Sequence, residues 1–118
     1  MRKIFLIAFC FLQIISVAYA NCEKYNTEEC CKTIQNSDKQ KLCLAVLNFN
    51  LNYCNQIQKP NLSAYCRSKI TQNIAECHGI GDSELQEICT LTLGYTVDVP
   101  SIIESDAYNF EGAIQWEI

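Results

Sequence analysis

The chain has 118 residues, of which 49% are hydrophobic, and a formal net charge of −4. This length fits a single domain. The composition lacks the basic excess with which proteins bind nucleic acid or anionic membrane surfaces, so we expect no nucleic-acid partner.

Residues 1–20 have the parts of a secretory signal peptide. A basic start at Arg2 and Lys3 is followed by an apolar run and a small-residue cleavage motif ending at Ala20. Cleavage there predicts a secreted or periplasmic protein with no stable membrane insertion afterwards. An uncleaved anchor is disfavoured because a membrane span needs about 20 apolar residues, and the run from Ile4 to Val17 is shorter. A lipoprotein acylated at Cys22 is disfavoured because a small residue is expected in place of Asn21.

The predicted mature chain is acidic, and the imbalance is local. Loss of two basic residues with the leader leaves seven basic and thirteen acidic residues. Residues 21–97 hold seven basic and eight acidic residues, whereas residues 98–118 hold five acidic residues and no basic one. We therefore predict three segments: a signal peptide over 1–20, a stapled domain over 21–97 and an acidic-aromatic tail over 98–118.

Eight cysteines remain after cleavage. They are Cys22, Cys30, Cys31, Cys43, Cys54, Cys66, Cys77 and Cys89. An even number in a short exported chain predicts a disulfide framework. Zinc sites favour closely spaced pairs such as C-x2-C, and no such pair is present, while a lone His78 beside a cysteine is a weak ligand signal. We therefore predict no metal site and no other cofactor.

The cysteines recur with a period of 23 residues. Cys31, Cys54 and Cys77 form one series, and Cys43, Cys66 and Cys89 form the other. An isoleucine follows three residues after each member of the first series, at Ile34, Ile57 and Ile80. A fixed period indicates one structural unit that is used several times.

Apolar residues between these cysteines recur at helical spacing. The pattern predicts a brief helical turn from Thr27 to about Thr33, then helices over 38–54, 61–77 and 83 to about 93. Short loops between helices make successive helices antiparallel. The predicted fold is therefore all-α, with three antiparallel helices from the 23-residue cysteine repeat, an N-terminal helical turn and an extended C-terminal tail. An irregular disulfide-rich coil is the alternative.

Helix geometry limits the disulfide pairing. Residues 11 apart on one helix lie about 16 Å apart along its axis, so an intact helix cannot join Cys43 to Cys54. In neighbouring antiparallel helices, a cysteine at the end of one helix faces the cysteine near the start of the next. With Cys22 and Cys30 left to each other, this predicts four pairs: Cys22–Cys30, Cys31–Cys43, Cys54–Cys66 and Cys77–Cys89. A crossed hairpin that joins Cys43 to Cys77 is the competing scheme, and the adjacent Cys30 and Cys31 are able to exchange partners.

The sequence favours a binding function over catalysis. It has a single histidine, His78, in a glycine-containing loop, and no nucleophile motif. We expect a non-catalytic secreted or periplasmic interaction module, not an enzyme. A small carrier of lipid or another hydrophobic ligand is one alternative, and a secreted toxin or enzyme inhibitor is another. Asn61-Leu62-Ser63 has the pattern of an N-glycosylation acceptor.

The tail is the predicted recognition element. Tyr108, Phe110 and Trp116 stand among acidic residues, and exposed aromatic residues are frequent anchors at protein interfaces. We therefore expect a protein partner to bind these three residues. The alternative is that the tail packs on its own helices.

Overall fold

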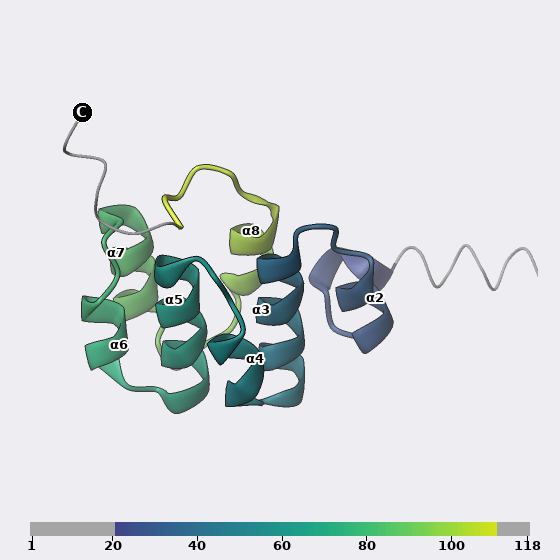
Figure 1. The fold of residues 1–118 in the computed structure, drawn as a ribbon, viewed down its shortest axis with the longest axis horizontal. Helices are drawn as coiled ribbons and strands as arrows, with labels where there is room; N and C mark the ends of the chain where they lie inside the picture. Colours follow the sequence, from purple (N-terminus) through teal and green to yellow (C-terminus); the bar gives the residue numbers. More distant parts are fainter. Residues whose placement is uncertain (1–20, 111–118) are drawn as a thin grey trace, which may run out of the picture.

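The computed structural model describes residues 21–110, so the predicted signal peptide and Trp116 lie outside it. Within this range the chain forms one short 3-10 helix and seven α-helices (Figure 1). They are η1 (Asn21–Lys24), α2 (Glu28–Lys32), α3 (Ser37–Asn48), α4 (Leu51–Asn55), α5 (Pro60–Thr71), α6 (Ile74–His78), α7 (Ser83–Leu91) and α8 (Val99–Glu104). The predicted all-α class is confirmed for the described part of the chain.

The repeating unit is a helical hairpin. The short helices α2, α4 and α6 begin 23 residues apart, and the long helices α3, α5 and α7 that follow them also begin 23 residues apart. A loop of only a few residues joins each short helix to its long helix, so the two pack as an αα-hairpin. Three such hairpins, stacked along the chain, make up the body of the molecule.

The helix predicted over 38–54 is broken after Asn48. Phe49 takes a left-handed conformation with φ 53°, and the side chain of Asn50 accepts the backbone N–H of Asn52 at 2.9 Å. An asparagine that caps a new helix in this way competes with continuation of the old one. The chain reverses here and enters α4, so the prediction of one continuous helix was wrong.

The same break recurs one period later, inside the helix predicted over 61–77. Gln72 has φ 55°, and Asn73 accepts the N–H of Ala75 at 3.0 Å. Thr27 holds the equivalent position before α2, where its hydroxyl accepts a backbone N–H of that helix. Asparagine or threonine at the same point of each unit therefore starts every short helix.

The long helices run parallel to one another. The carboxylate of Asp38, at the start of α3, accepts the N–H groups of Gln58 and Lys59, which lead into α5, at 3.1 Å each. One period later, Asn61 at the start of α5 accepts the N–H of Gly81 at 2.8 Å. The starts of consecutive long helices are thus side by side, as Figure 1 shows for α3 and α5. The expected three antiparallel helices are corrected to parallel long helices, with a short returning helix before each one.

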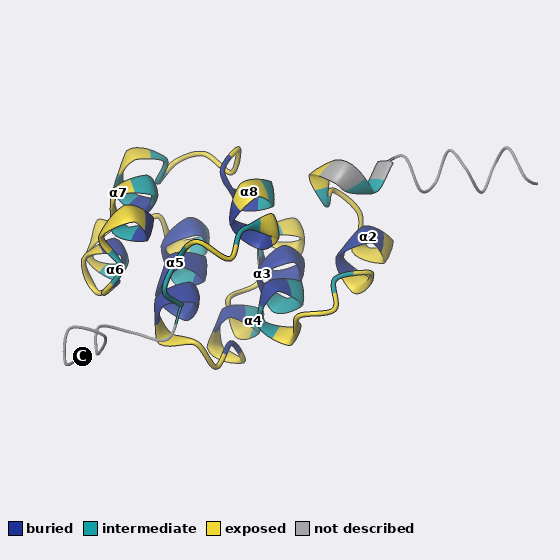
Figure 2. Cartoon of the chain, turned by 90° about the horizontal axis from the view of Figure 1, so that it is seen from above, coloured by how far each residue is buried: buried dark blue, intermediate teal, exposed yellow. Residues whose placement is uncertain are grey.

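The core lies where the long helices meet. α5 packs against both α3 and α7. Most of its residues are buried, and Figure 2 draws them in dark blue. The largest fully buried side chains come from four helices: Leu42, Leu62, Tyr65, Leu85 and Ile102. Ile57 and Ile80, two of the three repeated isoleucines, are also buried, and Ile34 is half-buried.

The four disulfides are those that the spacing predicts. The structure joins Cys22 to Cys30, Cys31 to Cys43, Cys54 to Cys66, and Cys77 to Cys89. The last three each join a short helix to the long helix of the same hairpin, with Cα atoms 5.4 to 5.6 Å apart. Each hairpin therefore carries its own covalent staple.

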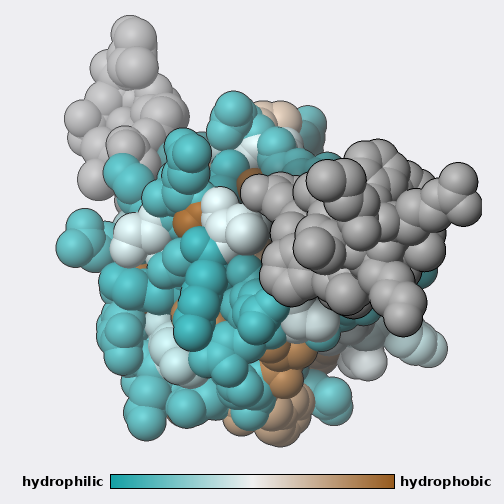
Figure 3. Space-filling view, turned by 90° about the vertical axis from the view of Figure 1, so that its right-hand side faces the viewer, coloured by the Kyte–Doolittle hydropathy of each residue, from teal (hydrophilic) through white to brown (hydrophobic). Residues whose placement is uncertain are grey.

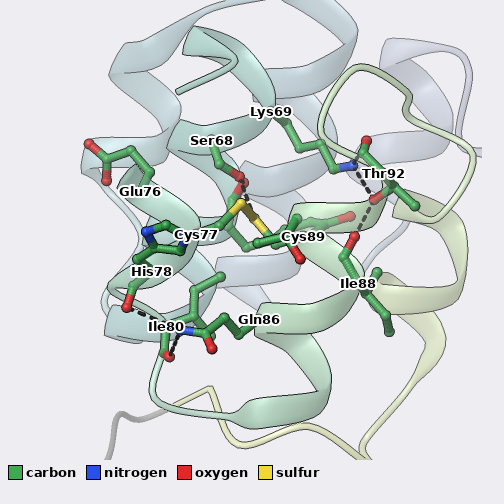
Figure 4. Close-up of a disulfide and its surroundings, with 12 residues drawn as sticks. Ser68, Lys69, Glu76, Cys77, His78, Ile80, Gln86, Ile88, Cys89 and Thr92 are labelled. Atoms are coloured by element: carbon green, nitrogen blue, oxygen red, sulfur yellow. Dashed lines mark hydrogen bonds between the residues drawn. A yellow bond between two sulfur atoms is a disulfide. The ribbon is translucent and has the colours of Figure 1, made fainter. Parts of the chain in front are cut away.

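Side-chain amides reinforce two of the staples. In Figure 4, Gln86 on α7 donates to the carbonyl oxygens of His78 and Ile80 at 3.1 and 3.2 Å, beside the Cys77–Cys89 bridge. Gln40 on α3 makes the same pair of hydrogen bonds two periods earlier. These bonds hold the loop of the hairpin on its long helix.

Removal of the central bridge should destabilise the protein strongly. The change Cys54→Ser with Cys66→Ser opens a loop of about 13 residues and is expected to lower the free energy of unfolding by roughly 2–5 kcal/mol. The measurement is unfolding in urea, monitored by circular dichroism. The matched control, Cys22→Ser with Cys30→Ser, opens a shorter loop at the edge and should cost less. Equal stability of the central variant and the parent would show that packing alone holds the hairpins.

Candidate functional site

The predicted tail begins inside the fold. Asp98 is buried, and α8 follows it with Val99, Ile102 and Ile103 buried. α8 packs on α3, far from it in sequence. The expected extended tail is thus corrected for its first residues, because these apolar side chains complete the core.

Residues 105–110 then cross the starts of the long helices. The ammonium group of Lys39 on α3 donates to the carbonyl of Ser105 at 2.9 Å, and the backbone N–H of Asn61 on α5 donates to the carbonyl of Phe110 at 3.0 Å. Asp82, the N-cap of α7, accepts the N–H of Asn109. Each of the three hairpins therefore holds this segment through one polar residue.

The structure brings two of the three predicted anchors together. The rings of Tyr108 and Phe110 lie 6.3 Å apart, and both residues are half-buried against the core. The ammonium group of Lys39 lies 5.6 Å from the ring centre of Phe110. This arrangement favours the alternative that residues 105–110 pack on their own helices. Trp116 lies outside the described residues.

The glycosylation pattern falls on a buried side chain. Asn61 is only 2% exposed, and its amide accepts the N–H of Gly81 and donates to the carbonyl of Asn109. A glycan would be attached to Nδ2, the buried atom that donates to Asn109. The position of Asn61 in the fold therefore gives it a structural role between two hairpins and the C-terminal segment.

A buried polar cluster joins α5 to the end of α7 and the start of α8. The ammonium group of Lys69 donates to the carbonyls of Thr92 and Tyr95 at 2.7 Å each, and to the carboxylate of Asp98 at 2.9 Å. The hydroxyl of Tyr65 donates to the same carboxylate. Figure 4 shows Lys69 reaching from α5 to Thr92. The ammonium group also offsets the partial negative charge of the carbonyl groups at the C-terminal end of α7.

The environment shifts two pKa values in this cluster. Burial raises the pKa of Tyr65, and the charge and hydrogen bond of Asp98 raise it further. Burial lowers the pKa of Lys69, although the hydrogen bond and charge of Asp98 oppose that shift. Buried charges are costly unless they are paired and hydrogen-bonded. We conclude that these groups act as an internal tie.

Exposed apolar side chains gather where the long helices end. We define the uncharged base as Phe49, Leu51, Ile74, Tyr95 and Val97. The base residues are between 36% and 81% exposed. The first three stand on the chain reversals after α3 and α5, and Tyr95 lies beside the end of α5 through its bond to Lys69. Figure 3 shows an apolar area at the lower edge of the molecule, the end at which α3 terminates in Figure 1.

The base and the chain around it carry no charge. Residues 42–58, 70–75 and 88–97 contain no acidic or basic residue. Three of the charged residues that flank these segments are paired: Lys69 and Asp98, 1% and 8% exposed, face each other, and Glu76 pairs with Arg67 at 3.0 Å. The base therefore presents aromatic and aliphatic groups among neutral amides and hydroxyls. The sequence pattern did not predict the base, although the three uncharged segments are visible in the sequence.

Loss of α8 should destabilise the fold. A chain that ends at Val99 lacks Ile102, Ile103 and the carbonyl acceptor of Lys39. Burial of one such apolar side chain contributes about 1.5–3 kcal/mol, so we expect a decrease of about 3 kcal/mol or more in the free energy of unfolding. The measurement is thermal and urea unfolding. The control ends at Phe110 and should match the parent. Equal stability at Val99 would mean that α8 contributes nothing to the core.

Stability should fall in alkali because of Tyr65. An unfolded tyrosine loses its proton near pH 10.0, whereas Tyr65 keeps its proton in the folded chain. Above that pH the folded state binds more protons, so the free energy of unfolding decreases as pH rises. The lowered pKa of Lys69 acts in the opposite direction, in a window below 10.5.

The variant Tyr65→Phe isolates the tyrosine contribution. Urea unfolding from about pH 9 to about pH 11.5 should show a flatter decline in this variant than in the parent. Tyr95→Phe, at a position 69% exposed, is the matched control and should keep the parent's slope. Identical slopes in all three proteins would contradict the shifted pKa of Tyr65.

The chain matches no family model, is similar to none of the curated proteins compared with it, and matches no solved structure. Within residues 21–110, no helix is long and apolar enough to cross a membrane. Four disulfides in one small chain indicate an oxidising, extracytoplasmic environment.

Proposed function

We propose that this protein is a non-catalytic interaction module, secreted or periplasmic, that binds a protein partner through the uncharged base. The observation that carries the proposal is the gathering of exposed aromatic and aliphatic side chains at one end of the stacked hairpins. Large exposed apolar groups that lie together mark interaction sites, whereas scattered ones need no explanation. The proposal moves recognition from the tail to the base.

The composition of the base suits a protein interface. Phe49 and Tyr95 are 65% and 69% exposed. Aromatic side chains are enriched at interfaces, where charged residues are depleted from the central area. Neutral neighbours such as Asn50, Gln72 and Thr96 can supply hydrogen bonds at the rim without the cost of burying a charge. The partner surface should accordingly be apolar in its centre and neutral around it.

The scaffold behind the base favours binding without reorganisation. Phe49 follows α3 and Ile74 begins α6, so both belong to hairpins with their own disulfide. Tyr95 is fixed through its carbonyl, which accepts from Lys69 at 2.7 Å. A surface that is already ordered loses less conformational entropy when a partner binds.

The tail is a weaker candidate for the binding site. Tyr108 and Phe110 already use much of their surface against the core. A partner that took them as anchors would first have to detach them, and with them the contacts of Lys39. The base residues need no such displacement.

Affinity capture with matched variants tests the proposal. The variant carries Phe49→Ser, Tyr95→Ser and Val97→Ser, three changes at exposed positions that should leave the melting temperature close to that of the parent. The control is Leu91→Ser, which removes an apolar side chain that is 72% exposed but lies on α7 outside the base. The parent, the triple variant and the control are each immobilised and used to capture proteins from the native environment, which quantitative mass spectrometry then identifies.

The expected result is a partner captured by the parent and by Leu91→Ser but lost with the triple variant. Removal of interface anchors typically weakens binding by at least about 2 kcal/mol, a factor of about 30. The dissociation constants of the captured partner should therefore differ by that factor or more. Capture by the triple variant equal to that by the parent would exclude the base. Loss of the partner in a chain ending at Phe110 would return recognition to the last residues.

A further inference from the structure

A surface pocket of about 270 Å³ opens between the N-terminal segment, α3 and α8. Its lining comes from three parts of the chain that are distant in sequence: Lys24, Tyr25, Asn26, Cys43, Val46, Leu47, Thr96, Val99 and Pro100. None of the five residues of the base lines it. The pocket is therefore a second site, which adjoins the base only through Thr96.

The inner wall of the pocket is apolar. Val46 and Leu47 come from the last turns of α3, and Val99 and Pro100 come from the first turn of α8. Cys43, with its disulfide to Cys31, adds a further apolar surface. Pockets lined by hydrophobic groups with few polar ones are typical of small-molecule sites. This wall suits a hydrocarbon chain.

The mouth of the pocket is polar and has one charge. Lys24, Asn26 and Thr96 are exposed there, and no acidic residue lines the pocket. Tyr25 closes one side, with φ 49°, and its hydroxyl donates to the carboxylate of Glu104 at 3.2 Å. That bond ties the N-terminal segment to the end of α8 and keeps the two walls together.

We infer that this pocket binds the aliphatic chain of a monocarboxylate amphiphile of medium length. The chain lies on Val46, Leu47 and Val99, and the carboxylate pairs with the ammonium group of Lys24. Asn26 and Thr96 offer neutral hydrogen bonds beside that pair. The single positive charge at the mouth selects an anionic head group over a neutral one, since the rest of the lining is uncharged.

The volume sets the length of the chain. One water molecule occupies about 30 Å³ in the liquid. On that scale a pocket of about 270 Å³ accepts about eight to ten non-hydrogen atoms. Small-molecule sites of roughly 300 to 1,000 Å³ take larger ligands, and a two-chain phospholipid does not fit here. Octanoate has the required size and charge.

Isothermal titration calorimetry of the oxidised mature chain with octanoate, hexanoate and octanol tests the inference. Octanoate should bind one to one with a dissociation constant below about 1 mM. Hexanoate should bind about fifteenfold more weakly, because each methylene contributes a factor of about four. Octanoate without saturable binding at that concentration would overturn the proposal.

Variants locate the site. Lys24→Gln should weaken octanoate binding about tenfold and leave octanol unchanged, whereas Lys32→Gln, an exposed lysine outside the pocket, should change neither. Val46→Trp fills the pocket from a half-buried position and should abolish binding of both ligands. Thr96→Trp does so from an exposed position, in case the first variant fails to fold. Octanoate binding that survives Thr96→Trp, or that Lys24→Gln and Lys32→Gln weaken equally, would overturn the proposal.

Discussion

The disulfide inside each hairpin is the constraint on which the fold depends. A five-residue helix such as α4 or α6 is too short to be stable alone, because the first helical turn is costly to form. The bridges hold these helices against α5 and α7 and so fix the direction in which the chain returns. Parallel long helices follow from that return, and with them the accumulation of all three helix ends, and of the base, at one end of the molecule.

The C-terminal part of the chain then ties the hairpins to one another. The disulfides lie within hairpins and form no link between them. Between hairpins, α5 packs against α3 and α7, and Asp38 and Asn61 accept backbone hydrogen bonds from the next hairpin. α8 returns from the end of α7 to α3, and Lys69 holds the start of that crossing to α5. Residues 105–110 make a second crossing at the opposite end. Stacked repeats usually contact only their neighbours, whereas here the chain ends also join distant units.

Cysteine spacing gave the period, and together with the helical spacing of the apolar residues it was enough to predict the all-α class and the same four pairs that the structure contains. It did not predict where the long helices end, because helical periodicity continues through Phe49 and Gln72 and gives no sign of a left-handed residue. The sign was present in the recurrence of Thr27, Asn50 and Asn73, which cap the short helices. The predicted antiparallel direction of the long helices was wrong for the same reason. Each chain reversal that is not predicted inverts the expected direction of the helices that follow it.

The binding surfaces were harder to predict than the fold. Acidic residues around Tyr108 and Phe110 suggested a tail that binds a partner. A short sequence pattern does not reveal that Lys39, Asn61 and Asp82 lie together to receive this segment. Conversely, Leu51 and Val97 read as ordinary apolar positions until the chain reversals place them on the outside. The pocket joins Lys24 to Val99 across most of the chain, and such a contact depends on tertiary packing alone.

The order of the bridges also bears on how the protein matures. Within residues 21–110, the eight cysteines are joined in four consecutive pairs, from Cys22 with Cys30 to Cys77 with Cys89. A chain that enters an oxidising compartment from its N-terminus exposes its thiols in that same sequence. The first free partner that each thiol meets is therefore its native one, and closure of such short loops is fast. The order of export thus favours the same pairs that the fold contains, whereas interleaved bridges would require reshuffling.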